Sequence, residues 1–484
     1  MNKKMIGRFT AKIILIEAVF LLPALAISFF RKETEATLGF AYTLLIMLAA
    51  GGLLHIFCRK AGKLFGAREG LVCVGLSWIV LSLLGCLPFL FSGAIPNFVD
   101  ALFEIVSGFT TTGASILSDV ESLPKGLLYW RSFSHWLGGM GVLVFLLAVT
   151  PGEGKGAGFT MHLLRAESPG PDVGKLVPKM RQTAVILYVI YVVMTIINVV
   201  FLLIGDMPLL DALCTAFGTA GTGGFGVKND SMASYSPYIQ TVTSVFMFLF
   251  GVNFSCYYLL LLRHLRGVFR DEELRLYVGI AVFSVVLIAI NIRNLYGSLS
   301  ETVRHATFQV SSIMTTTGFS TTDFDQWPAF SKGILLTLMV VGACAGSTGG
   351  GLKCARVLLL FKSLHRNVRQ ILNPKKVLVV RNNGKAVSEK VLENTTVYLV
   401  AYMVLAVGSF LLISIDGFNV ETNLSAVLAT LNNIGPGMAF VGPMCNYSQY
   451  SIVSKLVLTV DMLAGRLEIF PILVLLSRGT WRRN

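Results

Sequence analysis

The sequence predicts an all-α protein that crosses a membrane many times, with one helical unit repeated four times behind a two-helix hairpin. Composition is the first observation: 54% of the 484 residues are hydrophobic and 14% are charged, whereas soluble domains carry ~25% charged residues. The second is a Thr/Gly-rich motif that recurs four times in apolar surroundings. The third is the gathering of Lys and Arg into patches between the apolar segments, which is typical of loops on one side of a membrane.

The apolar segments give the order of the units. Two of them, at about residues 11–30 and 38–58, come first, and each is near the ~20 residues that a helix needs to cross a bilayer. We assign them to an N-terminal hairpin at 1–69, followed by pore modules at 70–180, 181–272, 273–391 and 392–484. Each module is predicted to hold a spanning helix, a short re-entrant helix, a Thr/Gly-rich tip and a second spanning helix, which gives ten spans in all.

The repeated motif centres on a glycine. Its copies lie at 103–115, 214–226, 308–320 and, in a divergent form, 425–437, and their central glycines are Gly113, Gly224, Gly318 and Gly435. The helix before the first tip has roughly eleven residues, or ~16 Å at 1.5 Å per residue, so it reaches only the middle of the membrane. Its C-terminal end carries partial negative charge, which favours a cation there.

Polar residues stand near the predicted starts of these re-entrant helices. We expect Asp100 and Asp211 to cap free backbone amides, with direct attraction of an ion as the alternative. Thr422 is expected to cap in the same way, and His305 to act as a polar starter without a metal or proton role.

The positions of the basic residues indicate which side of the membrane each loop lies on. Of 40 Lys and Arg residues, 28 fall in six patches, at 3–12, 59–68, 155–181, 263–275, 362–390 and 478–483. If the re-entrant helices cross only half of the membrane, every patch and both termini lie on the cytoplasmic side. The net charge of +14 therefore predicts no nucleic-acid partner. The eight cysteines show no CxxC spacing and are expected to be buried rather than bound to a metal or paired.

The tips have the composition of an ion-coordinating backbone. Thr favours extended chain and adds a hydroxyl oxygen, while Gly turns its carbonyl group where a side chain forbids it. Four tips around one axis would give a ring of oxygens that replaces the water shell of a monovalent cation. A single copy is better explained as a helix C-cap or turn, but the fourfold recurrence favours a filter. The candidate filter residues are Thr111, Thr112, Gly113, Thr222, Gly223, Gly224, Thr316, Thr317, Gly318, Asn433, Ile434 and Gly435.

The second helix of the third module is interrupted by a glycine-rich segment at 342–353. Three consecutive glycines break a membrane helix, and such a break must lie beside protein or water. We predict a movable gate below the tips; an alternative is a helix-packing face from Gly342 to Gly346. A phosphate loop is excluded, because the lysine comes one residue too late and no strand precedes it. The candidate gate residues are Gly346, Ser347, Thr348, Gly349, Gly350, Gly351 and Lys353, with Arg466 from the last span.

Arg466 is an ionisable residue inside a membrane helix, a costly placement that usually marks a pathway or a partner. We expect it either to repel cations below the tips or to donate hydrogen bonds to carbonyls that the glycine break frees. Pairing with Glu468 is the alternative, but residues two apart on a helix do not share a face. No other carboxylate is expected deep in the spans, which favours a gated conductor over proton- or sodium-coupled symport.

These motifs resemble the TrkH/KtrB/HKT superfamily of potassium transporters, and its TrkH branch in particular. The resemblance spans nearly the whole chain and rests on the four tips, on 136–141, on 345–353 and on 465–468. It implies a transport protein rather than an enzyme, with a pseudo-fourfold potassium pore in each subunit of a homodimer in the bacterial inner membrane. K+ is the transported ion, and no organic cofactor is expected.

The resemblance also implies roles for individual segments. The family's intramembrane gating loop corresponds to 345–353, its loop-contacting arginine to Arg466, and a cytoplasmic ring of nucleotide-binding TrkA subunits is the usual partner, docking in part on 362–390. Glycine rather than serine at Gly113 favours potassium over sodium. One departure is the fourth tip, which lacks threonine, so the ring is expected to be asymmetric and to bind the ion less tightly.

Overall fold

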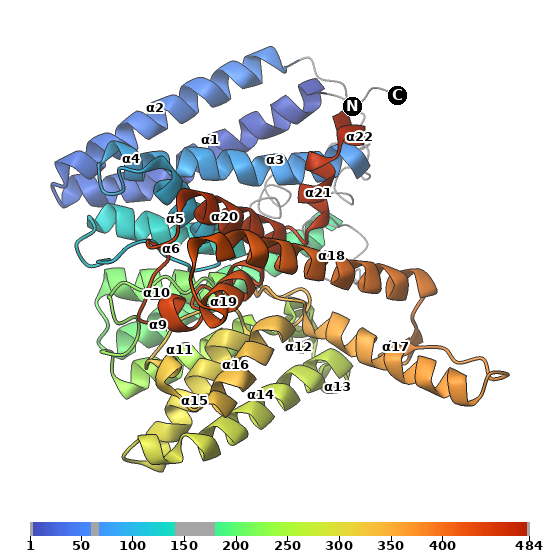
Figure 1. Ribbon diagram of the computed structural model, residues 1–484. Coiled ribbons are helices and arrows are strands. Elements are labelled where there is room, and N and C mark those ends of the chain that lie inside the picture. Colours follow the sequence, from blue (N-terminus) through green and yellow to red (C-terminus); the bar gives the residue numbers. More distant parts are fainter. Residues whose placement is uncertain (1–2, 60–66, 140, 142–179, 482–484) are drawn as a thin grey trace.

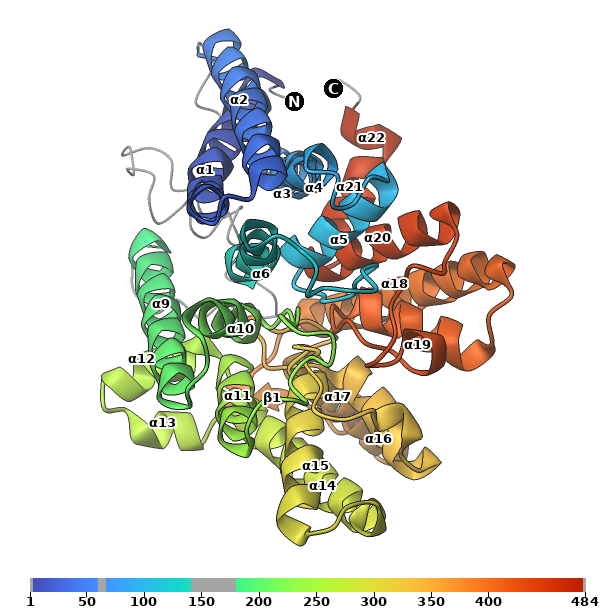
Figure 2. The same ribbon diagram turned by 90° about the vertical axis from the view of Figure 1, so that its left-hand side faces the viewer.

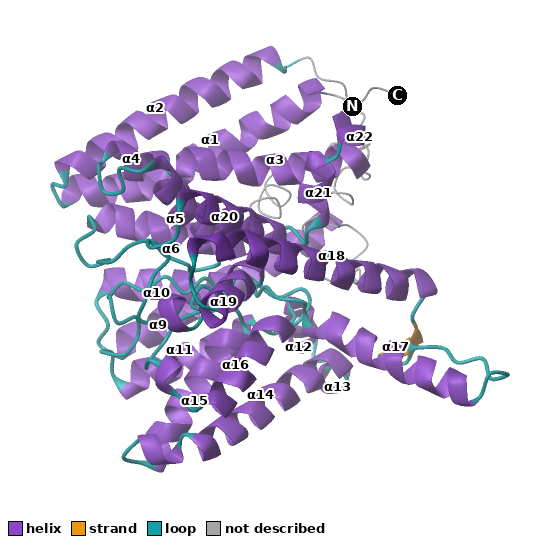
Figure 3. Ribbon diagram, in the orientation of Figure 1, coloured by secondary structure: helices purple, strands orange, loops and turns teal. Residues whose placement is uncertain are grey.

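The computed structural model describes residues 3–59, 67–139, 141 and 180–481 of the chain. Most of this is helix (Figures 1 and 3). In the described ranges the strands are β1 (Arg381–Asn382) and β2 (Lys385–Ala386), which pair antiparallel. The predicted all-α class is therefore confirmed.

The N-terminal hairpin consists of α1 (Lys3–Phe30) and α2 (Thr34–Phe57). Its turn is tied to the first module by Glu33, whose carboxylate accepts hydrogen bonds from the backbone amides of Lys125 at 2.7 Å and Gly126 at 3.2 Å. Viewed along the helices, the hairpin lies outside the ring of modules (Figure 2).

Each module begins with a long, mostly apolar helix. These helices are α3 (Ala67–Gly85) with its continuation α4 (Leu87–Phe91), α9 (Met180–Ile204), α14 (Glu272–Asn291) and α18 (Glu389–Ile413). Together with the hairpin they provide six spans that are long and apolar enough to cross a membrane within the described part of the chain. A continuous helix satisfies its own backbone groups, which is why these segments tolerate lipid.

The short helices before the tips are α5 (Phe98–Phe109), α10 (Leu209–Gly221), α15 (Leu299–Met314) and α19 (Val420–Leu431). All four start earlier in the chain than the sequence predicted. Asn97, Ser298 and Asn419 accept hydrogen bonds from the first-turn amides of α5, α15 and α19, and α10 begins directly after Pro208. Asn and Ser are better placed than the predicted residues because each adopts the extended N-cap conformation one residue before its helix.

The capping roles predicted for Asp100, Asp211 and Thr422, and the starter role of His305, are therefore wrong. Asp100 instead forms an ion pair with Lys455 at 2.7 Å. Asp211 accepts a hydrogen bond from the Tyr235 hydroxyl at 3.1 Å. His305 lies within α15, and its Nδ1 is 2.8 Å from the Thr321 hydroxyl.

The second helices of the modules are interrupted more often than the sequence predicted. They are α6 (Lys125–Gly139), α11 (Pro237–Phe250) with α12 (Phe254–Leu261), α16 (Ala329–Val341) with α17 (Cys354–Leu372), and α20 (Ile452–Arg466) with α21 (Phe470–Leu476). The sequence predicts a break only between α16 and α17. The structure also bends α11 and α12 by 90° and separates α20 from α21 at Glu468 and Ile469, whose φ values are 56° and 66°. The predicted continuation of α6 lies outside the described residues.

Shorter helices complete the chain. They are α13 (Leu265–Phe269), α22 (Arg478–Trp481) and the 3₁₀ turns η1 (Arg293–Leu295), η2 (Phe324–Gln326), η3 (Ser414–Asp416) and η4 (Ala439–Val441). The two termini, α13 and the outer part of α17 lie at one end of the molecule (Figure 1). The described residues of the basic patches are thus at a common end, whereas 60–66, most of the patch at 155–181 and 482–483 fall outside the described residues.

Seen along the helices, the four modules surround a centre where loops from each of them meet (Figure 2). The N-terminal half of each short helix is nearer the outside of this ring, and its C-terminal end delivers the tip to the middle. The fold therefore places four segments that are far apart in sequence at a single point.

Candidate functional site

The three-residue tips, 111–113, 222–224, 316–318 and 433–435, share one backbone conformation. Their first residues have positive φ: 55° at Thr111, 56° at Thr222, 59° at Thr316 and 55° at Asn433. The last residue of each tip, which is the central glycine of the repeated motif, also has positive φ. The values are 80° at Gly113, 74° at Gly224, 90° at Gly318 and 100° at Gly435. Positive φ is rare for residues other than glycine, so four equivalent non-glycine positions in this region indicate one repeated design. In each tip the first and last residues have positive φ and the middle residue does not. This alternation lets successive carbonyl groups face one side, whereas in a regular strand successive residues face opposite sides.

The tips close into a ring. A Cβ atom added to any central glycine would collide with a backbone carbonyl oxygen of the next module, and the fourth glycine faces the first tip. For Gly113, Gly224, Gly318 and Gly435 in turn, these oxygens belong to Gly223, Thr317, Ile434 and Thr112, at 2.0, 1.9, 2.0 and 2.6 Å. No side chain fits at these four positions while the ring keeps this width.

Side-chain hydroxyls hold the tips in shape. The Thr112 hydroxyl lies 2.8 Å from that of Thr110, and the Thr317 hydroxyl lies 2.8 Å from that of Thr315. In the fourth tip Asn433 replaces threonine, and its amide donates to the Thr112 hydroxyl at 3.0 Å. Asn433 thus joins the fourth tip to the first, so the divergent tip is built into the ring by its side chain.

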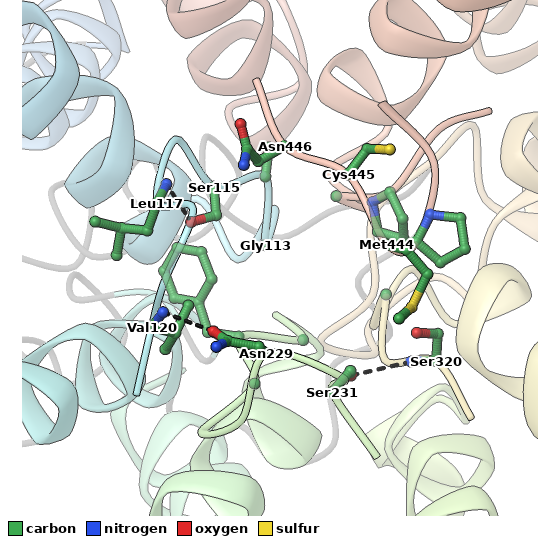
Figure 4. A pocket seen from close by; sticks show the side chains of 18 of the residues that line it. Gly113, Ser115, Leu117, Val120, Asn229, Ser231, Ser320, Met444, Cys445 and Asn446 are labelled. Atoms are coloured by element: carbon green, nitrogen blue, oxygen red, sulfur yellow. Dashed lines mark hydrogen bonds between the residues drawn. The ribbon is translucent and has the colours of Figure 1, made fainter. Parts of the chain in front are cut away.

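On one side of the ring is a pocket of about 120 Å³. All four central glycines border it, together with residues that follow them in the chain, including Ser115, Asn229, Ser320 and Cys445. Figure 4 shows these labelled side chains around an opening to which every module contributes. The lining combines backbone, hydroxyl and amide groups with apolar side chains, and its charged residues are Arg131 and Lys228.

The glycine-rich loop at 342–353 lies on the other side of the ring. It contacts residues that precede the central glycines. The Gly350 amide donates to the Thr316 hydroxyl at 2.6 Å. A Cβ added to Gly350 would lie 2.3 Å from the backbone carbonyl oxygen of Asn432. The Lys353 ammonium group binds the Gly349 carbonyl within the loop. Gly342, Gly346 and Gly351 all have positive φ, so the alternative of a helix-packing face at 342–346 is wrong.

Arg466 connects this loop to the first module. Its guanidinium group donates to the Thr348 carbonyl at 2.8 Å and to the Gly139 carbonyl, at the end of α6, at 2.7 Å. The alternative pairing with Glu468 is absent among the described contacts, because Glu468 binds Arg356 instead. Arg356 in turn lies 4.0 Å from the centre of the Tyr398 ring.

The expectation that no carboxylate other than Glu468 lies deep in the spans is wrong. Glu17 within α1 and Asp461 within α20 are both buried, as are Glu104 in the short helix α5 and Glu273 in the first turn of α14. Glu17 and Asp461 each stand alone within an apolar run, and that isolation was the available signal. Glu104 lies inside a repeat where no equivalent acid occurs, and Glu273 lies next to a basic patch, so neither was separable from ordinary polar residues.

Glu273 holds both ends of the glycine-rich loop. One of its carboxylate oxygens accepts from the Ala345 amide at 2.5 Å and from the Ala355 amide at 3.1 Å. The loop between these residues is therefore fixed at its base by α14, while its middle contacts the ring and Arg466.

Helices of membrane-crossing length around a central ring of repeated tips define a polytopic membrane protein. The chain belongs to the TrkH family of cation transport proteins, whose family model matches residues 38–480. Membership of this family confirms the resemblance seen in the sequence and the prediction of a transport protein rather than an enzyme.

Individual relatives match along almost their whole length. The chain is 37% identical over 477 residues to the Trk system potassium uptake protein TrkH of Salmonella typhimurium, covering 97% of each. It is 32% identical to the Trk system potassium uptake protein TrkG of Escherichia coli, covering 96% of this chain and 95% of that protein. The crystal structure of the potassium transporter TrkH from Vibrio parahaemolyticus superposes with a TM-score of 0.86, at 32% identity, over 98% of this chain and 99% of that one.

Proposed function

We propose that this protein carries potassium across the bacterial inner membrane, into the cell, through the ring formed by its four tips. The observation that carries the proposal is the closure of the ring, in which each central glycine faces a carbonyl oxygen of the next module. Relatives named as potassium uptake proteins at 37% identity support the choice of ion.

In this proposal the ion exchanges its water shell for backbone oxygens of the tips. It enters from the pocket beside Cys445, crosses the level of the four glycines and meets the glycine-rich loop. Asn433 stands where the other three tips have threonine, and Ile434 stands where two of them do. The oxygens around the ion are therefore unequal, and its binding is looser than in a fourfold-symmetric channel. The membrane potential drives entry, with ~2.3 kcal/mol per elementary charge per 100 mV.

The glycine-rich loop is the proposed gate. It presses against the third and fourth tips, and Arg466 holds its Thr348 carbonyl, so the contacts of the described conformation fit a closed pathway. Opening requires the middle of the loop to leave the ring. We assign control of this movement to a cytoplasmic ring of nucleotide-binding TrkA-type subunits that docks on 362–390, with two copies of the chain forming a dimer and both termini in the cytoplasm.

Flux through purified protein in liposomes tests the filter. Gly113→Ser should lower the ratio of potassium to sodium permeability, measured from reversal potentials in mixed salts, because the added side chain meets the Gly223 carbonyl. Gly279→Ala, at a helical position with open space around it, is the control. An unchanged ratio in Gly113→Ser removes Gly113 from the filter.

Proton-coupled symport is the second candidate, and the buried acids favour it. Both oxygens of Glu17 and one of Asp461 lack a hydrogen-bond partner in the described structure, and acids inside a membrane commonly mark proton relays. Under symport the reversal potential shifts with an imposed pH gradient, and Glu17→Gln or Asp461→Asn reduces that shift. A reversal potential that follows the potassium gradient alone supports conduction.

A further inference from the structure

A buried ion pair joins the first two tips. Its acid is Glu104 of α5, which is 0% exposed. The carboxylate accepts hydrogen bonds from the Ile116 amide at 2.9 Å and from the Ser115 hydroxyl at 3.0 and 3.1 Å. Glu104 therefore fixes the chain immediately after the first tip, on the side of the pocket.

The base of the pair is Arg131 of α6, which reaches the second tip. Its Nε donates to Glu104 at 2.5 Å, and its Nη1 donates to the Gly226 carbonyl at 3.1 Å. The guanidinium carbon lies 3.5 Å from the centre of the Phe225 ring. Since Phe225 and Gly226 directly follow the central glycine of the second tip, Arg131 holds this tip in the same way that Glu104 holds the first.

The other modules lack this pair. Counting back from the central glycines, the residues equivalent to Glu104 are Thr215, Gln309 and Ala426. At the junction of the second and third modules the corresponding link is neutral: the Ser320 amide donates to the Ser231 hydroxyl at 3.2 Å (Figure 4). A buried ion pair resists displacement more strongly than such a link, because separating its partners leaves two buried charges uncompensated.

We propose that Glu104 and Arg131 are positioning residues that set the distance between the first and second tips, and through it the discrimination between potassium and sodium. The inference rests on the proposed filter function. Both side chains act through the tip backbone rather than by binding the ion. The Glu104 carboxylate accepts hydrogen bonds from Ser115, Ile116 and Arg131. The Arg131 guanidinium group donates to Glu104 and to the Gly226 carbonyl. The ring is then held more rigidly at this junction than at the neutral link between the second and third tips.

The test is the potassium to sodium permeability ratio of the full chain in liposomes, taken from reversal potentials, because a ratio does not depend on how much protein is folded. The variant Glu104→Gln with Arg131→Met removes both charges and the bond to Gly226. We expect the ratio to fall several-fold to roughly tenfold, since a misplacement of about 1 Å can cost ~10²-fold in other preorganised sites. A ratio equal to that of the unaltered protein overturns the inference.

Arg131→Lys separates positioning from stability. Lysine keeps the buried charge opposite Glu104 but lacks the planar fork that reaches two acceptors, so it preserves folding and loses the link to Gly226. We expect a lowered ratio with normal thermal stability; an unchanged ratio shows that the pair only stabilises the fold. This variant also decides the question if the double neutral variant fails to fold.

The matched control is the pair Lys332–Glu421, which joins α16 to α19 at 2.7 Å without contacting a tip. Its removal in Lys332→Met with Glu421→Gln should leave the ratio unchanged, and a comparable fall there contradicts a specific role for Glu104 and Arg131. Gly113→Ser in the same assay distinguishes two failures. If it lowers the ratio and the Arg131 variants do not, only the positioning role is lost; if none of them does, the proposed filter fails.

Discussion

The central glycines carry the closest backbone approaches of the ring, and Gly318 combines two constraints. Its φ is 90°, and a Cβ there would lie 2.0 Å from the Ile434 oxygen and 2.9 Å from Pro436. The unfavourable φ alone costs of order 1–3 kcal/mol for another residue. Neither neighbour can move easily, since one is backbone and the other a proline ring.

We therefore expect Gly318→Ala to reduce potassium flux in liposomes at least tenfold while the protein still inserts and folds. Gly333→Ala is the matched control in the same module, because it lies within α16 with nothing near its Cβ. It should keep full flux and gain up to about 1 kcal/mol of stability from the loss of a helical glycine. Normal flux in Gly318→Ala would mean that the ring does not carry the ion.

At the residue scale the sequence marked the four glycines that the fold brings together, but it did not mark the buried acids. Gly113, Gly224, Gly318 and Gly435 were visible because each recurs at one place in a repeat, and repetition exposes a shared backbone requirement. Glu104 occurs once, so no repeat marks it. Its importance comes from an arginine in another helix and a carbonyl in another module, and such contacts exist only after the chain has folded.

Arg466 links the glycine-rich loop to the first module. It donates to Thr348 in the loop and to Gly139 at the end of α6, so it holds one segment of the third module against the first. Arg466→Ala removes these charge-assisted bonds, each worth roughly 1.5–3 kcal/mol. We expect flux in the absence of any regulatory subunit to rise several-fold.

Rubidium uptake into liposomes at matched protein amounts measures this effect. Arg293→Ala, in the exposed turn η1, serves as a charge-matched control and should behave as the unaltered protein. A flux that stays the same or falls in Arg466→Ala places the gate elsewhere.

Glu273 gives a second prediction for the same loop. Because one carboxylate oxygen accepts from both Ala345 and Ala355, Glu273→Ala frees both ends of the loop and should raise unregulated flux. Glu273→Gln retains an oxygen that can accept both bonds, so its flux should stay near that of the unaltered protein. Equal effects of the two substitutions would assign the role to the charge rather than to the hydrogen bonds.

At the level of elements the sequence predicted the helix break after α16, which a run of glycines marks. It did not predict the breaks after α11 and after α20, which have no such run. The loop after α16 contains three consecutive glycines, which no membrane helix tolerates. The bend between α11 and α12 needs only Gly251 and the Asn253 cap, and the break after α20 places Glu468 and Ile469 at positive φ. Tertiary packing imposes these conformations, so the local sequence propensity does not predict them.

The whole molecule joins four similar modules, yet its ring is not symmetric. An ion pair links the first and second tips, a serine links the second and third, and Asn433 links the fourth to the first. The repeat itself was readable from the sequence, whereas the different junctions were not, because each depends on residues that only one module carries. One face of this asymmetric ring is accessible to direct chemical test.

That face carries Cys445, which borders the pocket and is exposed, whereas the other seven cysteines are buried. A membrane-impermeant, positively charged thiosulfonate should therefore react with one site. Its attached cation would occupy part of a pocket of about 120 Å³ and repel potassium from the ring. We expect the reagent to slow rubidium uptake when it is added on the outer side of oriented membranes, and Cys445→Ser to abolish the block. Block from the cytoplasmic side, or block that persists in Cys445→Ser, would show that ions do not enter through this pocket.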